Sequence, residues 1–259
     1  MTLFQQESKY LMNTYATLPI EIAYGQGSYL FDKNNKKYID FTWHIKYSEE
    51  RELLQSKFVL NHFLEKTCVT NPKIIFTGGC YGAGKGHTMR YLHNIGKINL
   101  DNYVCADPDK IRILFPEYDL LINTNKDNMG IITNKEAGYI VELIEYYALE
   151  NNYNIIIDGS LKDHEWYIQH FQMIKKNFPQ FEIIIIFVMS DLETILNRNC
   201  FRCESTQRCI PLQLITDTFD KIDDAYQNYL GIIQKCYKIR NYKDDTDPDF
   251  ILDTNNVII

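Results

Sequence analysis

The sequence lacks an excess of basic residues, because its 27 lysines and arginines are outnumbered by 34 aspartates and glutamates. Non-specific nucleic-acid binding needs a basic surface, so the formal net charge of -7 disfavours that function. Long apolar runs are also missing. The longest, at 183–189, has the length of one strand, whereas a bilayer-spanning helix needs about 20 residues. We therefore expect neither broad nucleic-acid binding nor a membrane partner.

The N-terminal residues lack a basic stretch followed by an apolar core, and the first arginine is Arg51. Both observations argue against a signal or transit peptide. The seven cysteines form an odd, scattered set, which fits reduced thiols better than a disulfide framework. We therefore expect a cytoplasmic protein.

Two regions of the chain differ in their pattern. Within residues 1–45, two aromatic-rich runs flank an Asp-Lys-Asn-Asn turn and predict a β-hairpin. Apolar residues then recur at helical spacing through 48–67. We predict a hairpin segment at 1–45 and a larger domain at 46–259.

After Pro72, apolar strands alternate with amphipathic helices. The predicted strands are 73–77, 103–106, 154–158, 182–189 and a weaker one at 250–252. The predicted helices are 86–95, 108–115, 134–150, 163–177, 191–201 and 211–236, the third of them starting at a capping box at 133–136. This alternation predicts an α/β fold like that of P-loop kinases, with a parallel sheet covered by helices on both faces.

A glycine-rich segment follows the first of these strands. Residues 79–85 fit the first seven positions of the phosphate-loop pattern G-x-x-x-x-G-K-[ST]. In such a loop the backbone N–H groups surround the phosphates, and the lysine, here Lys85, reaches the β- and γ-phosphates. The candidate nucleotide-binding residues are Gly79, Cys80, Tyr81, Gly82, Ala83, Gly84, Lys85, Gly86, His87 and Thr88. We expect ATP as the ligand; the alternative is a glycine-rich turn without one.

The loop departs from the pattern at its last position. Gly86 stands where a Ser or Thr hydroxyl usually binds Mg²⁺, so Mg²⁺ would be held through water and carboxylates. His87 would contact the α-phosphate or cap the following helix.

Two carboxylates, Asp107 and Asp109, follow the second predicted strand. Because strand carboxyl ends face the ligand crevice of a parallel sheet, both are expected beside the phosphates. One could deprotonate an acceptor hydroxyl, and Asp107 could hold Mg²⁺ through water. Alternatively, Asp107 followed by Pro108 is a helix N-cap.

The chain at this point resembles the zeta-toxin-like kinases, and their eukaryotic-type members more than the bacterial toxins. The matching stretches are 74–88, 106–118, 136–149, 156–166 and 198–211. The resemblance implies transfer of the ATP γ-phosphate to a hydroxyl of a small molecule, which in bacterial members is a UDP-linked amino sugar.

The resemblance also implies roles for individual residues. Asp109 matches the hydroxyl-activating aspartate, and Arg112 matches a basic position after it. Asp158 replaces a substrate-binding glutamate of the bacterial members with a shorter carboxylate, and Ser160 follows as a further substrate-binding residue. Arg208 matches the catalytic lid arginine. Arg198 is a second catalytic candidate; both arginines could instead be ordinary surface residues.

Three cysteines in this lid segment, at 200, 203 and 209, have the spacing C-x2-C-x5-C. A structural zinc site needs four ligands, and no Cys or His nearby completes the set. We therefore expect buried thiols, with zinc as the alternative.

The segment 10–41 resembles the start of acetylornithine-type aminotransferases, including Gly25-x-Gly27 and the run at 37–41. The remainder of that family, with its Schiff-base lysine, has no counterpart here, so the length excludes aminotransferase activity. The segment would serve as a protein-docking element or be a gene-fusion remnant.

Two other functions compete with a small-molecule kinase. Gly86 and Asp158-Gly159 suggest a nucleoside-monophosphate kinase, although Ser160-Leu161-Lys162 replaces its phosphate-binding arginine. A non-catalytic ATP-binding regulator is the third possibility.

Overall fold

The computed structural model describes residues 22–26, 29–32, 37–39, 47–124, 129–206, 209–242 and 248–251. The chain divides into two compact units, Met1–Asn61 and His62–Ile259. The first contains a three-stranded antiparallel sheet of β1 (Ile22–Gln26), β2 (Tyr29–Asp32) and β3 (Lys37–Ile39), together with helix α2 (Glu49–Asn61). Strands β2 and β3 pair as the predicted hairpin. The predicted boundary at residue 45 stays a prediction.

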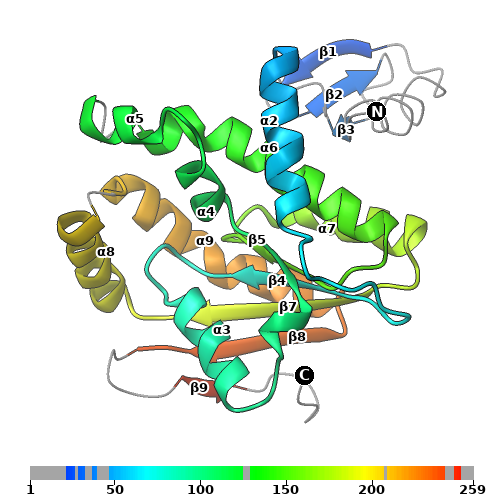
Figure 1. The fold of residues 1–259 in the computed structure, drawn as a ribbon. Helices are drawn as coiled ribbons and strands as arrows, with labels where there is room; N and C mark the ends of the chain where they lie inside the picture. The colour runs from blue at the N-terminus through cyan, green and yellow to red at the C-terminus, as the bar shows by residue number, and fades with distance from the viewer. Residues whose placement is uncertain are drawn as a thin grey trace. The chain divides into compact units, whose positions relative to one another are not determined.

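The second unit is built on a six-stranded sheet with the order β5-β6-β4-β7-β8-β9 (Figure 1). Its strands are β4 (Lys73–Gly78), β5 (Val104–Ala106), β6 (Ile155–Asp158), β7 (Glu182–Met189), β8 (Lys235–Arg240) and β9 (Asp249–Ile251). The first five in spatial order pair in parallel, and β9 pairs antiparallel to β8 at the edge. The prediction of a parallel sheet is therefore confirmed for five strands and wrong for β9.

The helices of this unit alternate with its strands. They are α3 (Lys85–Asn94), the short 3-10 helix η2 (Leu100–Asn102), α4 (Pro108–Ile113), α5 (Tyr118–Thr124), α6 (Met129–Glu150), α7 (His164–Asn177), α8 (Leu192–Thr206) and α9 (Leu212–Leu230). None of these or the other described helices is long and apolar enough to cross a membrane.

Three predicted helix boundaries were wrong by five or six residues, and one of them is the end of the helix predicted at 191–201, which continues to Thr206. The capping box expected at 133–136 lies inside α6, where the buried Thr133 hydroxyl donates to the Met129 carbonyl at 2.8 Å. The helix predicted at 211–236 ends at Leu230, and strand β8 begins at Lys235, inside the predicted helix. Cys236, Tyr237 and Ile239 are buried there, so burial beside β7 decides the structure of this short segment.

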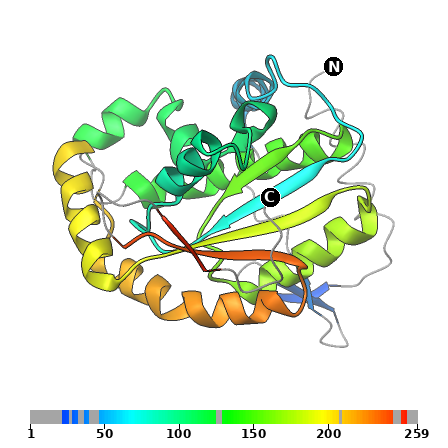
Figure 2. The ribbon, with the colours of Figure 1, turned by 90° about the horizontal axis from the view of Figure 1, so that it is seen from below.

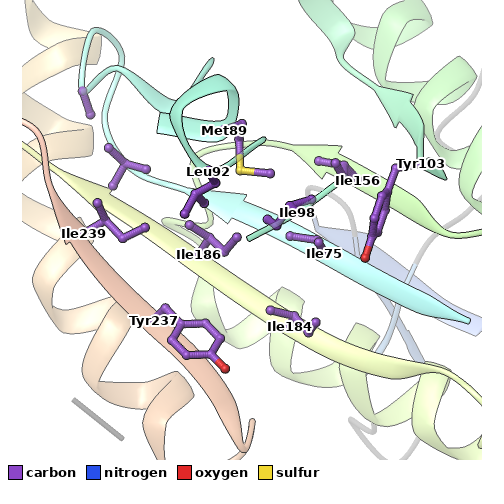
Figure 3. Packing of buried hydrophobic residues seen from close by; sticks show 12 residues of the cluster. Ile75, Met89, Leu92, Ile98, Tyr103, Ile156, Ile184, Ile186, Tyr237 and Ile239 are labelled. Carbon is purple, nitrogen blue, oxygen red and sulfur yellow. The ribbon is translucent and has the colours of Figure 1, made fainter. Parts of the chain in front are cut away.

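Each face of the sheet has its own core, because neighbouring strand residues point to opposite faces. On one face, Ile75, Ile156 and Ile186 pack in a buried cluster with Met89 and Leu92 of α3 (Figure 3).

On the other face, two aromatic pairs join strands to helices. The ring centroids of Phe76 and Phe171 lie 4.9 Å apart, and those of Phe187 and Tyr226 lie 5.4 Å apart. Helices α7 and α9 therefore cover this face, and α9, drawn in orange, runs beside the strands (Figure 2). The prediction of helices on both faces is confirmed.

Candidate active site

The glycine-rich loop joins β4 to α3 and requires glycine at defined positions. Gly79 and Gly84 have φ values of 134° and 88°, which residues with side chains rarely adopt. A Cβ atom at Gly79 would lie 2.2 Å from the Val188 carbonyl oxygen, and one at Gly84 would lie 2.1 Å from the Asn241 amide nitrogen. The loop backbone therefore packs closely against its surroundings, as a phosphate-binding loop requires.

Gly86 differs from these glycines. The nearest atom to a Cβ built there is a guanidinium nitrogen of Arg90 at 3.7 Å, and the φ of Gly86 is not in the left-handed region. The position is exposed at the first turn of α3. The space around residue 86 would thus accommodate the usual serine. The backbone does not require glycine there, and glycine only removes the hydroxyl that usually binds Mg²⁺.

The side chains after the loop face different environments. The ammonium of Lys85 donates to the Gly79 carbonyl at 3.4 Å and so lies across the loop. His87 is exposed, and no side chain caps α3, so the capping role considered for His87 is not formed. Thr88 is fully buried, and its hydroxyl has no hydrogen-bond partner in the described structure.

Helices α8 and α9 hold the loop in place. Arg198 donates to the carbonyls of Gly82 and Ala83 at 3.2 and 3.4 Å, and Asn199 donates to that of Tyr81 at 2.8 Å. The thiol of Cys80 contacts the Ile215 carbonyl of α9 at 3.4 Å, and burial raises the pKa of this thiol.

Carboxylates lie at the same edge of the sheet as the loop. In the register of the parallel strands, Thr77 is opposite Asp158, and Ala106 is opposite Ile157. The Thr77 hydroxyl donates a hydrogen bond to Asp158. Asp107, which follows Ala106, is therefore brought beside Asp158.

Asp107 is held among negative charges. Burial raises its pKa, and the charges of Asp158 and Asp109 raise it further. Its carboxylate accepts a hydrogen bond from the Asp109 amide at 2.9 Å and caps α4, with Pro108 in the first turn. The N-cap alternative is thus confirmed for Asp107.

Asp109 and Arg112 contact each other within α4. A guanidinium nitrogen of the buried Arg112 lies 3.5 Å from the Asp109 carboxylate, and Nε donates to the Pro108 carbonyl at 3.3 Å. The arginine therefore restrains the orientation of the carboxylate. The catalytic and substrate-binding roles of these two residues remain predictions.

A turn at 158–162 continues the site from the end of β6. The Gly79 amide donates to the Ser160 carbonyl at 3.0 Å, and the Gly159 amide donates to the Thr77 carbonyl at 3.3 Å. The turn also contains Lys162, which sequence reasoning noted only as a departure from another kinase pattern. Its position four residues after Asp158, at the end of a predicted strand, could have indicated that Lys162 belongs to the site.

The lid segment differs from its prediction. Cys203 and Cys209 form a disulfide, and Cys200 is free and exposed, so the expectation of three buried thiols is wrong. Among the described residues no group of three or more His, Cys, Asp or Glu side chains could hold a metal ion. Arg208 lies outside the described residues.

The comparisons with known proteins give one family and one fold. The sequence model of the zeta toxin family matches residues 61–247. A structure from the PezAT chromosomal toxin–antitoxin system of Streptococcus pneumoniae is similar, with a TM-score of 0.63 and 20% identity, over 80% of this chain and 81% of that chain. A structure of AvrRxo1-ORF1:AvrRxo1-ORF2 with ATP has a TM-score of 0.60 and 13% identity, over 79% and 67% of the respective chains. These likenesses show a common fold.

A separate similarity concerns a short segment. It is 48% identical over 40 residues to a probable mitochondrial acetylornithine aminotransferase of Schizosaccharomyces pombe, and 53% identical over 32 residues to the enzyme of Aquifex aeolicus. The chain spans only 9% and 8% of the lengths of these two relatives.

Proposed function

The chain belongs to the zeta toxin family of P-loop kinases, and we propose that it transfers the γ-phosphoryl group of ATP to a hydroxyl of a nucleotide-sugar. The observation that carries this proposal is the shared edge of the sheet. The glycine loop follows β4, and Asp107 and Asp158 stand at the ends of β5 and β6, two neighbouring strands on one side of it. Phosphoryl transfer needs this combination of an anion cradle and a carboxylate for the acceptor.

The loop and Lys85 bind the donor. The loop N–H groups and the N-terminus of α3 attract the phosphates, and the Lys85 ammonium, which lies across the loop at the Gly79 carbonyl, binds the β- and γ-phosphates. Preorganised cations and N–H groups stabilise the charge that spreads over the transferred group. Arg208 adds a second cation in this proposal.

Asp109 acts as the general base. The acceptor oxygen attacks the γ-phosphorus, its proton passes to the Asp109 carboxylate, and the bond to the β,γ-bridging oxygen breaks, so that ADP leaves with that oxygen. Arg112 orients the base through its contact at 3.5 Å. Asp158 and Ser160 bind the acceptor in the proposal.

The described residues offer no set of three direct ligands, but Asp107 suits a magnesium ion that keeps its water shell. Gly86 offers no hydroxyl, whereas Asp107 lies among carboxylates that raise its pKa, and a nearby divalent cation would relieve this repulsion. Asp107 would hold Mg²⁺ through water. When bound, the ion neutralises phosphate charge and orients the β- and γ-phosphates.

The test is a transfer assay with γ-labelled ATP against nucleotide-sugars, nucleosides and nucleoside monophosphates. We expect label on a nucleotide-sugar, and we expect Asp109→Asn to lower kcat about 10²- to 10⁴-fold. Asp220→Asn, at an exposed aspartate of α9, is the matched control and should leave the rate unchanged. If ATP raises the melting temperature but no label reaches any acceptor, the protein is a nucleotide-binding regulator. Label on a monophosphate would instead make it a nucleoside-monophosphate kinase.

A further inference from the structure

The phosphate loop packs on a small core that it shares with helices α8 and α9. Cys80 of the loop is buried in a cluster with Ile195 of α8 and Ile215 of α9. Tyr81 of the loop and Ile210, shortly before α9, are partly buried and pack against this cluster. The cluster is far smaller than the one beside the sheet. The position of the loop therefore depends on how α8 and α9 are held together.

Hydrogen bonds connect the same helices to the loop. The amide of Asn199 on α8 donates to the Tyr81 carbonyl at 2.8 Å and to the Ile195 carbonyl at 2.9 Å. The Cys80 thiol contacts the Ile215 carbonyl of α9 at 3.4 Å. A change in the distance between the two helices would thus strain or break contacts to two consecutive residues of the loop.

The Cys203–Cys209 disulfide ties α8 to the segment that leads into α9, next to these contacts. Cys203 follows Asn199 by four residues, about one helical turn, and Cys209 directly precedes Ile210. The bond therefore restrains both elements on which the loop packs. Breaking it gives the connection between them conformational freedom and removes a restraint on Ile210.

This disulfide is accessible and lies among free thiols. Cys203 and Cys209 are both partly exposed, and the nearby side chain of Phe201 is exposed. The other five cysteines are free, and three of them are exposed. A chain that relies on structural disulfides pairs its cysteines, whereas one accessible pair among free thiols is typical of redox-responsive proteins.

We propose that the Cys203–Cys209 pair is a reversible redox site for a dithiol reductant, and that its reduction loosens the phosphate loop and weakens the binding of ATP. A thiolate of the reductant attacks one sulfur of the pair, and the electron pair of the S–S bond passes to the other sulfur, which leaves as a thiolate. The second thiolate of the reductant then attacks the reductant's sulfur in this mixed disulfide and releases the second cysteine. The reductant becomes a disulfide, and its two protons convert the released thiolates to thiols.

The size of the effect is limited by the restraint that is lost. Reduction should weaken the binding of ATP about 3- to 30-fold, and the upper figure equals about 2 kcal/mol, which is the chain-entropy estimate for so short a loop. This part of the inference rests on nucleotide binding in the proposed function. The loosening of the loop does not.

The experiment equilibrates the full chain, well below its melting temperature, in mixtures of reduced and oxidised dithiothreitol. Alkylation and mass spectrometry give the oxidised fraction of the pair. Hydrogen exchange without nucleotide should be faster at 79–85 in the reduced protein and unchanged at 182–189 in β7. Calorimetry with the β,γ-imido analogue of ATP should show the loss of affinity, and both effects should reverse on re-oxidation.

Two variants sharpen the comparison. Cys203→Ser/Cys209→Ser should behave like the reduced wild type in every mixture. Cys200→Ser is the matched control, because Cys200 is a free, exposed thiol of α8 that contacts the Glu204 carboxylate at 3.7 Å. It should respond to reductant as the wild type does. If the double variant does not fold, the reduced wild type supplies the same state.

Four results would overturn the inference. The pair stays reduced in the oxidising mixtures; exchange at 79–85 is the same in both states; exchange in β7 rises as much as in the loop, which would show a global loss of stability; or the response disappears in Cys200→Ser. Faster exchange of the loop with unchanged affinity for the analogue removes the effect on ATP binding.

The outcomes also separate this inference from the kinase function. Redox-dependent exchange of the loop in a protein that binds the analogue in neither state removes the kinase function alone. Transfer of label to an acceptor together with redox-independent exchange removes this inference alone.

Discussion

The guanidinium of Arg198 lies 3.2 Å from the carbonyl oxygen of Gly82, in the middle of the phosphate loop. It donates as well to the carbonyls of Ala83 and Asn241, at 3.4 and 3.0 Å. One side chain of α8 thereby joins the nucleotide loop to the residue that follows β8. From the sequence we predicted that Arg198 is catalytic. Its contacts indicate a second role, which is to hold the backbone of the phosphate loop in place.

Replacing Arg198 distinguishes a catalytic role of its guanidinium from a role in holding the phosphate loop in shape. Arg198→Met leaves carbonyl groups of the loop unpaired, which costs about 1–3 kcal/mol, so we expect a melting temperature lower by about 3–10 °C. The KM for ATP should rise about tenfold while kcat changes less. Arg240→Met, at an exposed arginine of β8, is the control. A hundredfold loss of kcat at constant KM would show that Arg198 acts on the transferred phosphoryl group.

Gly86 offers a gain-of-ligand test. Because a Cβ is accommodated there, Gly86→Ser should keep its melting temperature within about 2 °C of wild type. The added hydroxyl can ligate Mg²⁺, so the Mg²⁺ concentration for half-maximal transfer should fall.

Gly84→Ala, in the same loop, is the contrasting variant. It forces a side chain into a left-handed backbone against Asn241 and should abolish ATP binding. An unchanged magnesium requirement in Gly86→Ser, or a Gly84→Ala variant that binds ATP normally, would contradict this account of the loop.

The raised pKa of Asp107 predicts that replacing this residue by asparagine increases the free energy of unfolding, by an amount that depends on pH. Its folded-state pKa is raised from 3.8, so the ionised carboxylate destabilises the fold, and the penalty grows as pH rises through the folded-state pKa. Asp107→Asn keeps a good N-cap and should melt higher than wild type at pH 7. The difference should shrink as the pH falls through the folded-state pKa and vanish below 3.8, as thermal unfolding across pH would show. A difference independent of pH would mean that the charge of Asp107 is not responsible.

The disulfide of the lid predicts a redox-sensitive stability. Closing the short loop between Cys203 and Cys209 contributes about 2 kcal/mol by the chain-entropy estimate. Since 1 kcal/mol corresponds to about 2–4 °C in a chain of this length, reductant should lower the melting temperature of the wild type by several degrees. The melting temperature of the double variant Cys203→Ser/Cys209→Ser should not change with reductant. Thiol titration of the denatured protein should find five free cysteines before reduction and seven after it. Seven before reduction would show that the pair does not form.

Features governed by local sequence were predicted well. The glycine loop is one example, since its spacing is imposed by backbone conformation over a few residues. Strand β7 was predicted at its observed limits, because a run such as 183–189 must be buried on both faces.

Features that depend on distant contacts were missed. Strand β8 alternates polar and apolar residues weakly, and only pairing with β7 separates it from the preceding helix. The disulfide and the Lys162–Thr218 contact each join segments whose approach depends on where α9 packs. Local propensity contains no information on that approach.

One backbone hydrogen bond, from the Gly79 amide to the Ser160 carbonyl, joins the phosphate loop to the turn at 158–162. A shift of the loop when phosphates arrive must move Ser160 or break this bond. In the proposed kinase, ATP and acceptor would then be thermodynamically linked, each changing the affinity for the other by the same factor. In the proposed kinase, the end of a single strand would therefore couple the two substrates, so that the affinity for each depends on the presence of the other.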